Sequence, residues 1–226
     1  AQSRTITITG KGKLSGTDIQ VPGDISSAAF FMVAAAIADK SEVKIMQVGL
    51  NPTRTGIVSL LKLMNVNIEV SNKRVIGGEP IGDIKVISSS LVGISVPPEL
   101  VPLAIDEFPI ICIAAGCASG TTVVKGAEEL RVKESDRIQA MADGLNNLGI
   151  AVKVFEDGLQ IDGGNILGGR VKSYADHRIA MAFTIAAIRS KEPVLIEDCK
   201  NVGTSFPGFV DLAKSVGINI KETSND

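Results

Sequence analysis

Residues 28–38 read Ala-Ala-Phe-Phe-Met-Val-Ala-Ala-Ala-Ile-Ala, a run without one polar side chain. A helix that is apolar on every side has to be buried on every side. Similar apolar runs fall within residues 99–118 and 176–190, so three such helices would have to bury one another. We therefore expect helices in the middle of the molecule and sheets outside them, the reverse of a TIM barrel.

The three apolar runs belong to a repeat. A Leu-x-Gly motif recurs at spacings of 77 and 76 residues, as Leu14-Ser15-Gly16, Leu91-Val92-Gly93 and Leu167-Gly168-Gly169. Each motif follows one predicted strand (5–9, 84–88, 158–162) and precedes a second strand (18–21, 92–96, 170–173) and an apolar helix (about 25–39, 99–118, 176–190). Next come a strand (42–48, 121–125, 193–198), an amphipathic helix (53–64, 134–148, 204–215) and a closing strand (66–70, 150–154, 218–221).

These patterns predict an α/β (α+β) domain of three repeated βαβαββ units. The units are expected at about 16–88, 89–162 and 163–226, and residues 1–15 as a hinge or strand from another domain. The chain opens without Met inside a predicted strand, which indicates a cut in a longer protein. Because an open sheet edge is a liability, we expect strand 5–9 to fold back beside strand 217–221, which lacks a following partner.

Composition excludes several classes of function. The net charge of −2 gives no electrostatic reason to expect nucleic acid as a partner. No apolar run reaches the ~18 residues of a membrane span, and no signal peptide is visible. The three cysteines lack metal-site spacing and are odd in number, so neither a metal site nor a disulfide framework is expected. Cysteine usage of this kind suits the cytoplasm.

Residues 131–137, Arg-Val-Lys-Glu-Ser-Asp-Arg, put five charges at the start of a predicted helix. This pattern is typical of a solvated helix start, with Ser135 or Asp136 as the N-cap. Arg137, however, falls in the first turn, where the helix dipole disfavours a cation. An anion bound between this arginine and the free backbone N–H groups would account for it.

Residues 174–178, Tyr-Ala-Asp-His-Arg, show the same anomaly and contain the chain's one Tyr and one His. Asp176 is a candidate N-cap, and Arg178 again lies in the first turn. His177 has two interpretations, a hydrogen-bonded structural histidine or a residue of an anion site.

Two adjacent carboxylates, Asp106 and Glu107, lie between apolar runs just before Phe108 and Pro109. They are either caps of a helix that begins at Pro109 or buried functional acids. The glycine-rich segment 10–16 is interpreted as a turn, because it leads into a strand and a nucleotide loop requires a helix N-terminus.

Four motifs in order resemble one family. Pro-Gly-Asp-Ile-Ser-Ser-Ala at 22–28, Arg-Val-Lys-Glu-Ser-Asp-Arg at 131–137, Asp-His-Arg at 176–178 and Ser-Phe-Pro at 205–207 resemble the C-terminal half of the 5-enolpyruvylshikimate-3-phosphate synthases, or 3-phosphoshikimate 1-carboxyvinyltransferases. The segments 51–56 and 105–107 resemble the branch of that family often found to tolerate glyphosate. The resemblance implies an enolpyruvyl transferase-type fold and two similar domains that close on substrates at a hinge.

The resemblance also implies the chemistry. Its substrates are phosphoenolpyruvate and shikimate 3-phosphate, its partner is the missing N-terminal domain of the same enzyme, and no metal or cofactor is implied. By position, Asp106 matches the base at the shikimate 5-hydroxyl and Glu134 the acid that protonates the methylene. Arg137 and Arg178 match the pair that clamps the phosphoenolpyruvate carboxylate, and Lys133 a lysine near the shikimate ring. His177 falls among these substrate-binding residues.

One position departs from the family pattern, and two other functions stay open. Thr204 stands where many relatives carry a lysine, so no phosphate-binding lysine is assigned there. One alternative is a UDP-N-acetylglucosamine enolpyruvyl transferase domain, which the motifs at 131–137 and 176–178 disfavour. The other is a non-catalytic anion-binding module. Without the N-terminal half of the site, this chain alone is expected to be inactive.

Overall fold

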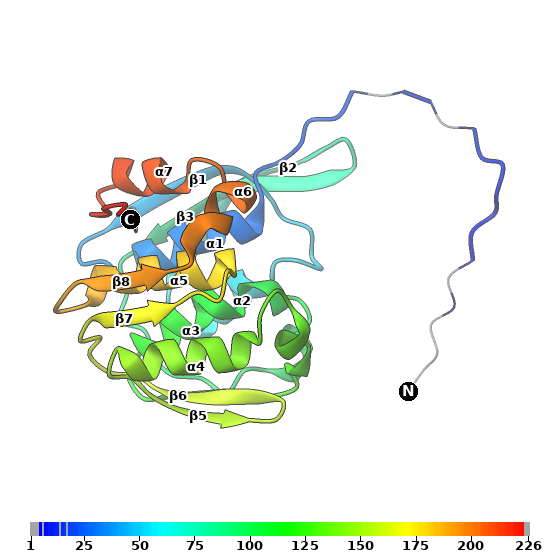
Figure 1. The fold of residues 1–226 in the computed structure, drawn as a ribbon. Coiled ribbons are helices and arrows are strands. Elements are labelled where there is room, and N and C mark those ends of the chain that lie inside the picture. Colours follow the sequence, from blue (N-terminus) through cyan, green and yellow to red (C-terminus); the bar gives the residue numbers. More distant parts are fainter. Residues whose placement is uncertain (1–4, 6, 14, 17, 224–226) are drawn as a thin grey trace.

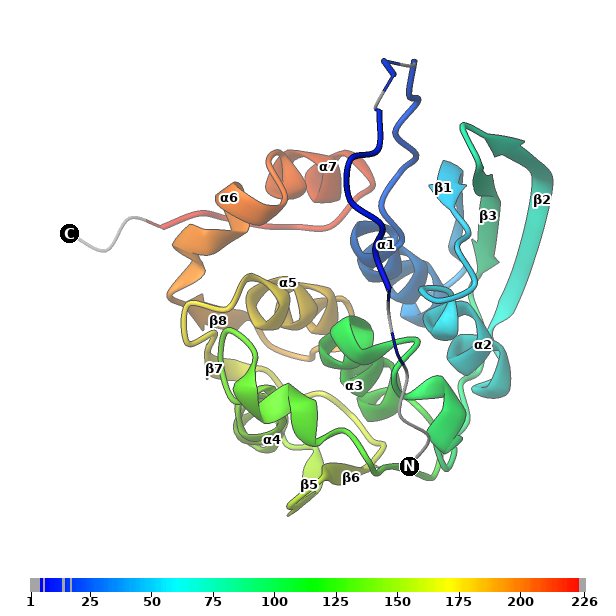
Figure 2. The ribbon, with the colours of Figure 1, turned by 90° about the vertical axis from the view of Figure 1, so that its right-hand side faces the viewer.

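The structure is a computed structural model and describes residues 5, 7–13, 15–16 and 18–223. Three helices pack against one another in the middle, α1 (Ile25–Ile37), α3 (Phe108–Gly116) and α5 (His177–Ala186). Figure 2 shows them surrounded by the three sheets. Every residue of α1 except Ser27 is buried. The predicted arrangement of buried helices and outer sheets is therefore confirmed.

The first two units each contribute a three-stranded antiparallel sheet with the unit's last strand in the middle, in the orders β1-β3-β2 and β4-β6-β5 (Figure 1). Their elements are β1 (Glu42–Gly49), α2 (Gly56–Leu63), β2 (Asn67–Ile76), β3 (Glu79–Ile87), β4 (Thr121–Val124), α4 (Arg137–Asn147), β5 (Ala151–Phe155) and β6 (Gly158–Asp162). Short 3-10 turns lie at Pro98–Leu100, Ile105–Glu107 and Glu128–Val132.

The strand expected before each central helix forms fully only in the third unit. There β7 (Gly169–Lys172) pairs in parallel with β8 (Val194–Glu197). In the other units it is reduced to isolated parallel bridges, Gly23 with Val48, Val92 with Ser119 and Ser95 with Val123. The prediction of a strand at 18–21 is therefore wrong, because these residues form an exposed coil and the bridge to β1 is at Gly23.

The third sheet has two strands within the described chain, so the predicted strand at 217–221 is also wrong. Ile218 instead bonds back to the carbonyl of Ala213, and Ile218 and Ile220 pack against the core. Residues 5 and 7–9 are exposed coil without a backbone bond to 217–221, which contradicts the predicted pairing; Ile6 lies outside the described residues. In Figure 1 the described N-terminal segment runs away from the domain.

Aromatic packing closes the ring of three units. The second helix of unit three is split into α6 (Val202–Ser205) and α7 (Phe209–Ser215), preceded by 3-10 turns at Ala187–Arg189 and Cys199–Asn201. Phe206 and Phe209 pack on Phe31 of α1 with ring centroids 6.2 and 5.9 Å apart. The Ser-Phe-Pro motif therefore joins the third unit to the first.

The amphipathic helix α4 packs against the central helices α3 and α5 and against strands β5 and β7. α4 approaches α5 closely at Gly144, where an added Cβ would lie 2.1 Å from the Phe183 ring. Gly149 and Gly217 follow helices with φ of 86° and 96°, the left-handed geometry in which glycine ends a helix. None of the described helices has the length and apolarity needed to cross a membrane.

Candidate active site

The candidate site lies where the three central helices begin. Asp24 caps α1 by accepting from the backbone N–H groups of Ser26 and Ser27, at 3.3 and 2.8 Å. Asp176 caps α5 by accepting from the N–H of Arg178 at 2.9 Å, as predicted. Helix starts carry partial positive charge, so their convergence favours anions at this end of the domain.

A buried ion pair joins α4 to α5. The Arg137 side chain is 1% exposed and the Asp176 side chain 0%, and Arg137 Nε lies 2.8 Å from Asp176 Oδ2. Arg137 Nη2 also donates to Glu134 at 2.5 Å. Arg137 therefore has protein carboxylates as partners in the first turn of α4. This corrects the expectation that a bound anion accounts for a cation at this position. Arg137 Nη1 is the exception, a buried nitrogen without a hydrogen-bond partner in the described part of the chain.

The segment before α4 is held by Arg131. Its guanidinium donates to the carbonyls of Glu156 and Phe155 at 2.7 and 2.6 Å, and to Asp136 at 2.7 Å. Asp136 in turn caps α4 by accepting from the N–H of Gln139, which confirms one of the two predicted caps. Arg131 therefore serves to anchor the loop that carries Lys133 and Glu134.

Asp106 lies among cations. Its carboxylate is 3.3 Å from Lys133 Nζ and 3.8 Å from Arg137 Nη1. Arg54 Nη2 approaches it to 3.7 Å from the other side. Partial burial alone would raise the pKa of Asp106, but the positive charges of Arg178, Lys133 and Arg54 outweigh it and lower this pKa. The cations around Asp106 therefore favour its ionised form.

Glu107 is buried beside Asp106, and its pKa is shifted in the opposite direction. It occupies the N-cap position of α3 without making a side-chain cap bond, which excludes the cap alternative for its side chain. Its carboxylate accepts from Ser26 Oγ at 2.5 Å and lies 3.5 Å from Arg178 Nη1. Burial raises the pKa of Glu107, and the Ser26 bond and the Arg178 charge offset it only in part.

The structure gathers most of the residues predicted from sequence. Asp106, Lys133, Glu134 and Arg137 form one chain of contacts, and Arg178 donates to the carbonyl of Asp106 at 2.9 Å. His177 is the first residue of α5, and burial lowers its pKa. Thr204 lies on the surface of α6.

The sequence analysis gave no site role to two residues of this cluster, Ser26 and Arg54. Ser26 and Arg54 are bonded to each other at 2.9 Å, and Ser26 joins them to Glu107. The available signal was a pair of serines at the start of an otherwise apolar helix, since a buried hydroxyl needs a partner. The partner lies 81 residues away in sequence, which no local pattern reveals.

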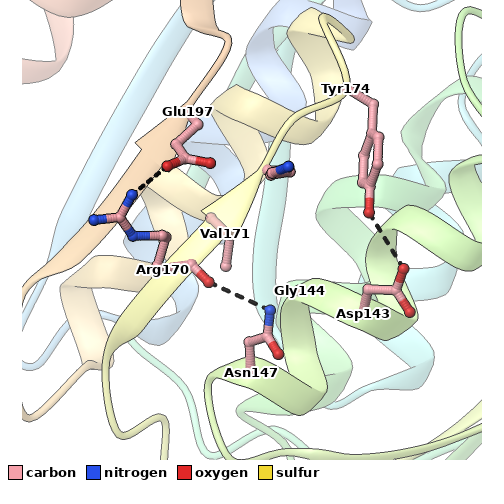
Figure 3. A pocket seen from close by; sticks show the side chains of 8 residues that line it. Asp143, Gly144, Asn147, Arg170, Val171, Tyr174 and Glu197 are labelled. Carbon is pink, nitrogen blue, oxygen red and sulfur yellow. Dashed lines mark hydrogen bonds and ion pairs between the residues drawn. The ribbon is translucent and has the colours of Figure 1, made fainter. Parts of the chain in front are cut away.

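A separate hollow of about 150 Å³ lies between α4 and β7 (Figure 3). Tyr174 Oη donates to Asp143 across it at 3.3 Å, and Arg170 pairs with Glu197. Tyr174 and Ala175 both have positive φ, 55° and 57°, in the turn that leads to Asp176. The Tyr174 side chain therefore braces that turn against α4.

Similarity to solved structures defines the class of protein. An EPSP synthase from Acinetobacter baumannii superposes with a TM-score of 0.90 at 53% identity, covering 93% of this chain and 49% of that one. The enolpyruvyl transferase NikO from Streptomyces tendae shares the fold at a TM-score of 0.69 and 17% identity, over 92% of this chain and 46% of that one. The domain thus has the enolpyruvyl transferase fold.

Sequence comparison gives the family. The profile of EPSP synthase (3-phosphoshikimate 1-carboxyvinyltransferase) matches residues 1–212. The 3-phosphoshikimate 1-carboxyvinyltransferase of Alkalilimnicola ehrlichii is 56% identical over 96% of this chain and 49% of its own length. That of Methylococcus capsulatus is 57% identical over 93% and 48%. The chain belongs to the EPSP synthase family, and it spans about half the length of the curated relatives it matches.

Proposed function

We propose that this chain supplies one half of the active site of an enzyme that transfers the enolpyruvyl group of phosphoenolpyruvate to the 5-hydroxyl of shikimate 3-phosphate. The observation that carries the proposal is Arg137 Nη1, a buried guanidinium nitrogen left without a hydrogen-bond partner in the described residues. It lies beside Asp106, at the helix starts. A substrate carboxylate at this nitrogen would complete its bonding, because guanidinium groups grip planar carboxylates.

The proposed reaction has two stages. Asp106 takes the proton of the 5-hydroxyl while the hydroxyl oxygen bonds to C2 of phosphoenolpyruvate. At the same time Glu134 gives a proton to the methylene carbon. In the tetrahedral intermediate the bond from C2 to the phosphate oxygen then breaks. Phosphate leaves with the proton that Asp106 had taken up, and the methyl carbon returns a proton to Glu134, which restores the enolpyruvyl group. A carboxylate with a depressed pKa suits the first role once a neighbouring cation has activated the hydroxyl.

Glu134 and the incoming carboxylate would share one guanidinium. Glu134 holds Arg137 Nη2, and the free nitrogen is Nη1 of the same group. Two ligands of one guanidinium lie next to each other, so Glu134 would stand beside the methylene that it protonates. Lys133, 3.3 Å from Asp106, would contact the shikimate ring, with Arg178 and His177 completing the wall from α5.

We further propose that residues 16–226 form one domain and that residues 1–15 lead to a second domain. The second domain would supply the rest of the site. Support comes from exposed apolar residues on the segment entering α1 and beside Lys133. Ile19, Val21 and Val132 are 74%, 82% and 80% exposed. A second domain closing over the helix starts would cover them and exclude water from the reaction. The three cysteines are free thiols, and we place the enzyme in the cytoplasm on that ground.

A chimera tests the proposal. The N-terminal half of the Methylococcus capsulatus relative, fused ahead of this chain, should release phosphate from phosphoenolpyruvate only when shikimate 3-phosphate is present. Its rate should approach the ~10 per second of a typical enzyme. The chain alone, and a chimera carrying Glu134→Gln, serve as controls and should be inactive or nearly so. A folded chimera that binds neither substrate, or that prefers UDP-N-acetylglucosamine as acceptor, would overturn the proposal.

A further inference from the structure

Glu107 is a buried acid to which the proposed reaction gives no role. Its side chain is 1% exposed, and it makes no bond to the backbone of the helix it precedes. Burying a carboxylate is costly unless its contacts compensate. The contacts of Glu107 should therefore show what its burial achieves.

Those contacts reach both other helix starts. Ser26 at the start of α1 donates to Glu107 Oε1 at 2.5 Å. The same oxygen lies 3.5 Å from Arg178 Nη1 in the first turn of α5. One carboxylate oxygen just before α3 thus links α1 and α5.

Each contact fixes a cation at the site. Arg178 has two partners for Nη1, the Glu107 carboxylate and the carbonyl of Asp106 at 2.9 Å. Ser26 donates its one hydroxyl proton to Glu107, which leaves its lone pairs free to accept from Arg54 Nη2 at 2.9 Å. Without Glu107 the Ser26 hydroxyl could turn, and Arg54 would lose a defined acceptor.

We propose that Glu107 is a positioning residue that fixes Arg178 directly, and Arg54 through Ser26, in the orientation in which they meet an anionic substrate. The identity of that substrate rests on the function proposed above, whereas the positioning itself does not. A glutamine at 107 would keep the shape and an acceptor oxygen for Ser26, but it would lose the charge that holds Arg178.

The positioning is tested on the 226-residue chain by nitrogen NMR of arginine side chains, with Arg178 identified by its missing signal in Arg178→Lys. Rotation of the Arg178 guanidinium should be slow in the native chain and markedly faster in Glu107→Gln. Glu99→Gln, an exposed glutamate away from the site, is the matched control and should leave the signal unchanged. Equal rotation rates in the native chain and Glu107→Gln would overturn the proposal.

Steady-state kinetics of the chimera test the positioning role separately, because a residue that only stabilised the fold would not change KM for phosphoenolpyruvate selectively. Glu107→Gln should raise KM for phosphoenolpyruvate about tenfold, the scale of one lost charge-assisted contact, with kcat within a few-fold. In an Arg178→Lys background the same change should add almost nothing, because contacting residues are coupled. Fully additive effects would overturn the proposal. A chimera without any transfer activity would count against the proposed function alone, because the NMR result still decides the role of Glu107.

Discussion

Asp176 and Glu107 are both buried carboxylates at helix starts, yet their surroundings push them in opposite directions. Arg137 lies 2.8 Å from Asp176, and its hydrogen bond and charge overcome burial to lower the pKa of that carboxyl. The nearest guanidinium nitrogen to Glu107 is 3.5 Å away, and burial prevails to raise its pKa. Both side chains are almost fully buried, but Asp176 also accepts hydrogen bonds from Ser135 and from the Arg178 backbone. The closer cation and these additional donors together outweigh burial at Asp176, whereas the contacts of Glu107 do not.

The largest effect is expected when the cation of the Arg137–Asp176 pair is removed. Arg137→Leu should destabilise the chain by about 3–5 kcal/mol, since it leaves Asp176 buried and uncompensated. Urea unfolding of the native and Arg137→Leu chains measures this difference in the free energy of unfolding. From sequence alone this arginine stood in the first turn, where the helix dipole disfavours a cation. A loss below about 1 kcal/mol, the value of a surface pair, would contradict the expected destabilisation.

Glu134 shares Arg137 with Asp176, but its side chain is 52% exposed. Glu134→Gln should therefore cost stability no more than about 1 kcal/mol. In the chimera it should reduce kcat by about 10²–10⁴-fold, the usual effect of losing a general acid. Turnover within a few-fold of the parent chimera would remove Glu134 from the mechanism.

The tight pair also depends on how closely α4 approaches α5. Gly144→Ala places a methyl group 2.1 Å from the Phe183 ring, and overpacking of this kind costs about 1–3 kcal/mol. Gly203→Ala is the matched control, because nothing lies within 4 Å of its added Cβ. Thermal unfolding should show a lower melting temperature for Gly144→Ala and no loss for Gly203→Ala. Equal shifts in the two variants would mean that the close approach of α4 to α5 does not affect stability.

Much of the fold follows from the sequence, for identifiable reasons. Residues 28–38 have no polar face, so their burial could be predicted, and Asp136 and Asp176 cap helices as their positions suggested. The contacts of the site could not be predicted in the same way. The Arg137–Asp176 pair joins positions 39 apart and Ser26–Glu107 positions 81 apart, and both depend on the packing of helices from different units. The strand at 217–221 failed because strands need a neighbour, and the described chain offers none.

The smallest effect expected is on the pH dependence of stability. The contributions of Asp176 and Glu107 to stability change in opposite directions as the pH rises. Asp176, with its pKa lowered, contributes stability that is present above its unfolded pKa of about 3.9 and is lost as pH falls through the lower folded value. Glu107, with its pKa raised, contributes stability that is complete below its unfolded pKa of about 4.3 and is lost as pH rises through the higher folded value. Glu107→Gln should therefore flatten the stability profile above about pH 4, as measured by urea unfolding across pH; an unchanged slope there would contradict this.

The most direct test of the comparison is to titrate both carboxyls in the native chain by carbon NMR, with signals assigned through Asp176→Asn and Glu107→Gln. We expect Asp176 to titrate below about 3.9 and Glu107 above about 4.3, the ordinary values for these side chains. If both pKa values shift the same way, or if Glu107 titrates below Asp176, the surroundings of the two buried acids do not push them in opposite directions.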